Sequence, residues 1–146
     1  MFGHPLHPAV VHFPIALLLS ASAADVAWLA GLTADTYIGA VLMAAGLVMG
    51  LVAMGAGMVD FARLDEAIVP HALRHMGAVG LAWIGYAIAL YLRRDVLLSN
   101  GEIAPAAVAA SLVSAAFLSL GGWLGGRLVY TFGAGVETKV REPKGR

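Results

Sequence analysis

The stretch from residue 37 to residue 60, YIGAVLMAAGLVMGLVAMGAGMVD, contains no charged side chain before Asp60. A helix needs about 20 apolar residues, at a rise of ~1.5 Å each, to cross the hydrocarbon core of a bilayer. This stretch is long enough to do so, and residues 8–31, 70–91 and 103–130 form three more apolar stretches of similar length. The sequence therefore predicts four transmembrane helices.

The composition of the whole chain also indicates a membrane protein. Of its 146 residues, 60% are hydrophobic and 12% are charged, and the mean hydropathy is +0.84. Polar side chains are too few to cover a soluble globule of this size. Nine Lys and Arg balance nine Asp and Glu, which leaves no basic surface for nucleic acid. Because the chain has no cysteine, any metal site has to use His, Met or carboxylate ligands.

The short connections between the apolar stretches favour an up-down-up-down bundle with antiparallel neighbours. We predict an all-α integral membrane protein with one four-helix transmembrane domain over residues 1–135 and a polar basic tail over 136–146. Seven basic residues lie on the side of both termini, and only Arg93 and Arg94 lie on the other. The positive-inside rule therefore predicts that both termini are cytoplasmic. A cleaved signal peptide usually has Lys or Arg before its apolar segment, and this chain has neither before the first helix. We therefore expect the first helix to be retained.

All five histidines fall on that predicted cytoplasmic side: His4, His7 and His12 at the first helix, and His71 and His75 at the start of the third. Imidazole is costly inside a bilayer unless it binds something, so this cluster suggests a haem or metal site. Small residues mark the packing faces of helices in lipid. The small-residue stripes of the first and third helices include His12, His71 and His75, which we expect to face inward. His4 and His7 would form a cap.

Three further polar residues stand out. Asp60 and Arg127 reach the same end of the bundle as the histidines; they are either interfacial, with Arg127 lying along Trp123, or an ion pair or anion-binding group. Asp25 lies about two turns from the far end of the first helix, where an unpaired charge is costly; its partner is not identifiable from the sequence. The motif GGWLGG over 121–126 predicts close packing of the fourth helix on a neighbour.

Several motifs carry a family resemblance: HPLHPAVVHFPIAL over 4–17, a second helix ending in Asp60, the HAL opening of the third helix over 71–73, and GGWLGGRLVY over 121–130. Together they resemble a widespread bacterial family of four-helix membrane proteins that is catalogued as a domain of unknown function. The resemblance covers almost the whole chain and implies the bacterial inner membrane. It also implies a redox setting, since the module is sometimes fused to Rieske iron–sulfur or cytochrome c domains. The family-like positions are His4, His7, His12, Asp60, His71 and Arg127, and His75 fits the shared pattern least.

The leading hypothesis is a membrane-embedded b-type haem protein that transfers electrons to or from a redox partner or a quinone. The iron ligands would be His12 with His71 or His75, and Arg127 would neutralise the propionates. One alternative is a non-haem metal-binding or ion-conducting protein that uses the same cluster. Another is a structural subunit of a redox complex. We also expect a homo-oligomer, most simply a dimer. An enzyme is less expected than an electron-transfer or binding protein, because the sequence shows no nucleophile, paired carboxylates or phosphate loop at usable spacing.

Overall fold

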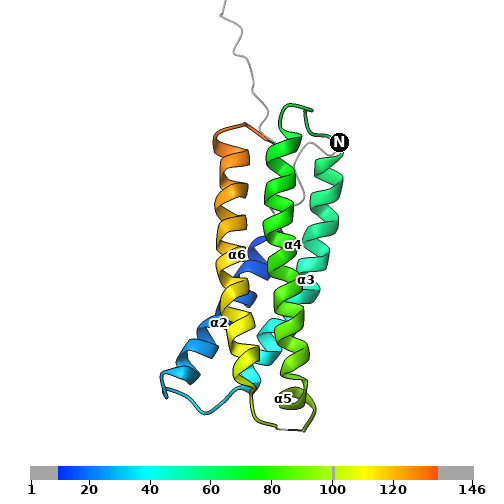
Figure 1. The fold of residues 1–146 in the computed structure, drawn as a ribbon. Helices are drawn as coiled ribbons and strands as arrows, with labels where there is room; N and C mark the ends of the chain where they lie inside the picture. The colour runs from blue at the N-terminus through cyan, green and yellow to red at the C-terminus, as the bar shows by residue number, and fades with distance from the viewer. Residues whose placement is uncertain (1–9, 100, 135–146) are drawn as a thin grey trace, which may run out of the picture.

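The computed structural model describes residues 10–99 and 101–134 of the chain. Its long helices are α2 (His12–Leu29), α3 (Tyr37–Phe61), α4 (Val69–Leu92) and α6 (Pro105–Tyr130), and a short helix, α5 (Arg94–Ser99), lies between α4 and α6. The four long helices are long and apolar enough to cross a membrane, and they pack as a bundle (Figure 1). The prediction of an all-α four-helix membrane bundle is confirmed. Helix α5 occupies a connection that the sequence suggested to be a loop.

Local sequence explains where the helices begin and end. Pro70 and Pro105 stand in the first turns of α4 and α6, where a residue without an N–H breaks no helical hydrogen bond. Helix α2 ends at Leu29 because Gly31 has a φ of +69°. The N–H of Leu32 then donates to the carbonyl of Ala27 at 2.9 Å, which completes a glycine-dependent helix stop. Helix α2 has only 18 residues, whereas α3 has 25.

The bundle consists of two closely packed helix pairs, α2 with α3 and α4 with α6, which meet less extensively. We call the end at which α3 finishes and α4 begins the histidine end, and the end that carries α5 the opposite end. Helix α2 slants behind the other helices, and its first residues lie short of the histidine end (Figure 1). Between the pairs lies a core cluster that includes Leu18, Met43, Ala82, Tyr86 and Leu118.

Glycines allow α6 to approach α4 closely. A Cβ atom added at Gly121 would lie 2.7 Å from Cγ2 of Val79, and one added at Gly125 would lie 3.0 Å from Cε1 of His75. Both distances are too short for ordinary packing, so glycine is required for this helix approach. The prediction that GGWLGG is a close-packing motif is confirmed for these two positions.

The small-residue stripes predict the packing face of α4 correctly but that of α2 wrongly. In α4, Ala78, Ala82 and Ala89 are buried. In α2 the stripe carrying His12 is exposed: His12, Ala16, Ser20 and Ala23. The buried face instead contains Pro14, Leu18, Ala21, Ser22 and Asp25. The prediction that His12 faces inward is therefore wrong, because the face of α2 that turns inward is the one that carries its charged residue.

Candidate functional site

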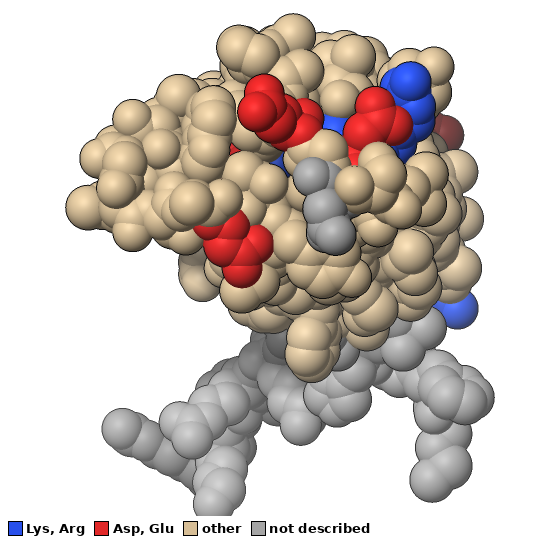
Figure 2. Space-filling model, turned by 90° about the horizontal axis from the view of Figure 1, so that it is seen from below, with Lys and Arg blue, Asp and Glu red and all other residues tan. Residues whose placement is uncertain are grey.

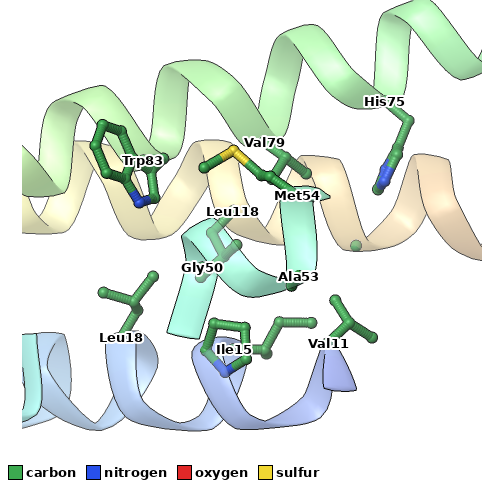
Figure 3. A pocket seen from close by; sticks show the side chains of 12 residues that line it. Val11, Ile15, Leu18, Gly50, Ala53, Met54, His75, Val79, Trp83 and Leu118 are labelled. Atoms are coloured by element: carbon green, nitrogen blue, oxygen red, sulfur yellow. The ribbon is translucent and has the colours of Figure 1, made fainter. Parts of the chain in front are cut away.

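An apolar cavity of about 60 Å³ lies where the four long helices meet, on the histidine side of the core. His75 and Trp83 lie at its two ends, both on α4, and α2 faces them from across the cavity (Figure 3). The lining residues come from every long helix: Val11, Pro14, Ile15 and Leu18 at the start of α2; Gly50, Ala53 and Met54 of α3; His75, Val79 and Trp83 of α4; and Leu118 and Gly122 of α6. His75 is the one titratable group among them.

The imidazole of His75 is held in a fixed orientation. Its Nδ1 lies 2.8 Å from the carbonyl oxygen of Gly121. A carbonyl only accepts hydrogen bonds, so Nδ1 carries the proton, and in the neutral ring Nε2 is then the nitrogen with the lone pair. Histidines that bind metals commonly donate their other ring N–H to a carbonyl in this way. The hydrogen bond thus fixes the orientation of the ring and makes Nε2 the acceptor nitrogen of the neutral imidazole.

Phe132 brings His71 and Arg127 together at the histidine end. The rings of His71 and Phe132 stack with centroids 4.0 Å apart. The guanidinium carbon of Arg127 lies 5.1 Å from the ring centroid of Trp123 and 5.9 Å from that of Phe132. The predicted position of Arg127 along Trp123 is confirmed. Phe132 had no predicted role, since nothing in the sequence indicates that the chain after α6 turns back toward His71.

His12 is not among the described residues that line the cavity beside His75. Val11 lines the cavity, so α2 begins near the depth of His75, but the side chain of His12 is exposed. Asp60 is half-buried in the last turn of α3. The ion pairs formed between described residues are Arg93 with Asp25 and Arg94 with Asp95, rather than Asp60 with Arg127. His4 and His7 lie outside the described residues. Within residues 10–99 and 101–134, no three His, Asp or Glu side chains form a metal-binding group.

The donor chemistry and the volume of the site lead to different conclusions about haem. Nε2 of His75 suits one coordination position of haem iron. The cavity of about 60 Å³ is several times smaller than the ~300–1,000 Å³ typical of ligand pockets. A haem macrocycle therefore does not fit inside the cavity between the described helices.

The sequence profile of a family described as predicted membrane protein (DUF2231) matches residues 3–138. The chain belongs to this family. The match covers almost the whole chain, as the motifs in the sequence predicted. No curated protein and no solved structure matches this DUF2231 chain. The family description supports a membrane location and assigns no activity.

A second polar group in this DUF2231 protein lies toward the opposite end. Nη1 and Nη2 of Arg93 donate to the two carboxylate oxygens of Asp25 at 2.8 and 2.9 Å. Arg93 also donates to the carbonyls of Ala89 and Ala107, and its side chain is 0% exposed. Buried charges are tolerated when they are paired and hydrogen-bonded in this way. Figure 2 views this end, where a few charged side chains stand on a largely uncharged surface, most of them near one edge.

A hydroxyl cluster continues from this ion pair into the bundle. The hydroxyl oxygen of Ser22 lies 2.9 Å from the Tyr86 hydroxyl and 2.9 Å from that of Ser111. The cluster and the ion pair both join α2 to the α4–α6 pair. The count of basic residues places Arg93 with Arg94 on the side opposite the termini and gives no indication of this ion pair. One signal was present: Asp25 is the only charged residue of α2, and Arg93 lies at the matching end of α4.

Proposed function

We propose that this DUF2231 protein binds haem b through His75 and transfers electrons in the bacterial inner membrane, with both termini in the cytoplasm. The observation that carries the proposal is the hydrogen bond from Nδ1 of His75 to the Gly121 carbonyl, which directs the lone pair to Nε2. Haem b, when bound, supplies one-electron chemistry at its iron. The redox partner, a protein or a quinone, belongs to the same proposal.

The proposal requires space beyond the cavity, because the cavity itself is too small for a macrocycle. His12 is not part of it, since its side chain faces away. His71 is the other α4 candidate, and His4 and His7 are predicted ligands from the segment that precedes Val11. His7 lies four positions before Val11 at the cavity wall, and an extended chain of four residues spans at most about 14 Å. His7 would therefore lie near enough to the cavity wall, by chain length, to help His75 hold the same group.

The test is an absorbance spectrum of protein purified from a haem-replete host, taken before and after dithionite. A Soret band that shifts on reduction supports the proposal, and a colourless preparation overturns it. The variant His75→Asn keeps a side-chain N–H at the position of Nδ1 for the Gly121 carbonyl but has no counterpart of Nε2. It should fold and lose the band, whereas His12→Asn is the matched control and should keep it. Stoichiometric zinc, copper or iron without a Soret band, lost in His75→Asn, would support a non-haem metal site instead.

The outward stripe of α2 favours a second candidate, a subunit that assembles with a copy of itself. Ala16, Ser20 and Ala23 are exposed together on one face of a membrane helix, and small residues let helix backbones approach closely in lipid. Because the chain has no cysteine, single cysteines report contacts directly. Ser20→Cys should form disulfide-linked dimers in membranes under oxidation, whereas Ile84→Cys, also exposed but on α4, should not. Equal cross-linking at the two positions would refute this candidate.

A further inference from the structure

Apart from His75 at one end, the residues that line the cavity have apolar side chains or are glycines, and the indole N–H of Trp83 is already bonded to the Leu47 carbonyl. Water or an ion in such a space would lack the two to four polar partners that a buried water needs. An apolar group in the cavity would supply the dispersion contacts that the lining of an empty space lacks. The chemistry of the lining therefore selects hydrocarbon or another apolar group.

The size of the cavity sets the size of that group. At about 60 Å³, it is less than half of the ~150 Å³ of a protein cavity that binds benzene or xenon. It has room for a group of a few heavy atoms. Such a group is the end of a hydrocarbon chain, or a free apolar molecule of similar size.

The cavity reaches the surface of the bundle at Gly122. This residue lines the cavity and is also exposed, and a Cβ atom added to it would have no described neighbour within 4 Å. The first residues of α2, Val11 and Pro14, line the same cavity. The opening therefore lies beside the start of α2, which begins short of the histidine end (Figure 1).

The opening lies within the depth of the bilayer. Gly122 is eight residues before Tyr130, the end of α6, or about 12 Å along the axis at ~1.5 Å per residue. Helix α6 has 26 residues, so at about 39 Å it exceeds the ~30 Å hydrocarbon core by roughly 4 to 5 Å at each end. Gly122 thus lies roughly 7 Å inside the hydrocarbon. A molecule that enters there comes from the lipid.

We propose that this cavity is a binding site for an apolar group that enters from the bilayer past Gly122. The two sources with this chemistry are the end of a lipid acyl chain and a small free apolar molecule. The site is independent of the proposed function, because it requires no metal at His75. It uses the apolar walls and the opening at Gly122.

Trp83 reports occupancy, because its indole lines the cavity. In a Trp28→Phe/Trp123→Phe background, Trp83 is the one remaining tryptophan. This single-tryptophan variant is reconstituted in bilayers whose acyl chains carry bromine near the depth of Gly122, and the quenching of its fluorescence is measured. In plain bilayers, dissolved xenon tests the free-molecule source in the same way. Gly122→Leu should abolish most of the quenching that reaches Trp83 through the opening.

Gly126→Leu is the matched control. Gly126 lies one turn further along α6, also has no described neighbour within 4 Å of an added Cβ atom, and does not line the cavity. Quenching by brominated chains that depends on Gly122 but not on Gly126 assigns the acyl chain, and the same pattern with xenon alone assigns the free molecule. Quenching that is equal in both variants overturns the proposal. If Gly122→Leu fails to fold by circular dichroism, Gly122→Val with Gly126→Val gives the same comparison with a smaller side chain.

Discussion

Removing Asp25 should destabilise the bundle far more than removing the whole ion pair. In Asp25→Ala, the guanidinium of Arg93 loses both carboxylate bonds, of 2.8 and 2.9 Å, and keeps only the carbonyls of Ala89 and Ala107. Arginine cannot lose its proton in a protein, so an uncompensated charge remains buried. Breaking a buried pair from one side costs about 3–5 kcal/mol, whereas replacing both partners by apolar groups is often nearly neutral.

The reverse variant, Arg93→Met, should cost less than Asp25→Ala, roughly 1–3 kcal/mol, because the remaining carboxyl group can take up a proton and become neutral. The double variant Asp25→Ala/Arg93→Met should recover most of the stability lost in Asp25→Ala. The free energy of unfolding is measured in mixed micelles by titration with SDS, with helicity as the signal. Arg94→Met is the control, because the Arg94–Asp95 pair is exposed and spans 3.7 Å, and such pairs contribute about 0–1 kcal/mol. Additive losses in the double variant would refute the coupling.

Two further predictions concern packing and the hydroxyl cluster. Gly121→Ala should destabilise the bundle by about 1–3 kcal/mol, because the added methyl group overlaps with Val79. Gly77→Ala should be neutral or stabilising by up to about 1 kcal/mol, because an added Cβ there has no described neighbour within 4 Å. Thermal unfolding of the two variants checks the difference, and equal losses of stability would contradict it. Ser22→Ala should lower the free energy of unfolding by about 1–3 kcal/mol, because it leaves the buried hydroxyl of Tyr86 without its partner. In a Tyr86→Phe background the same substitution should lower the free energy of unfolding by less. An equal loss in both backgrounds would count against the hydrogen bond.

The helices and their packing mode could be predicted from the sequence because each rests on local information. Hydropathy over about 20 residues defines a membrane helix without reference to its neighbours. The glycines at 121 and 125 likewise predict a close approach, and only the identity of the partners, Val79 and His75, required the structure. Hydropathy and helix length were sufficient to predict the four-helix fold.

The inward face of α2 could not be predicted from small residues alone. Alanine and serine occur on both sides of this helix, and the stripe with His12, Ala16 and Ser20 proved to be outward. A buried carboxylate costs far more than an exposed alanine, so Asp25 determines the orientation. Its partner is 68 residues away in the chain, a pairing that no local pattern contains. The role of His12 as a ligand stays a prediction, but one that its exposed position does not support.

The ion pair between Asp25 and Arg93 also constrains how the chain is made. Asp25 leaves the ribosome 68 residues before its partner, and at roughly 5–20 residues per second this is a delay of about 3 to 14 s. During that interval α2 and α3 are already synthesised while the carboxyl group of α2 has no guanidinium to pair with. The first two helices are therefore not a finished insertion unit, and the membrane assembly of this protein is complete only when the end of α4 arrives.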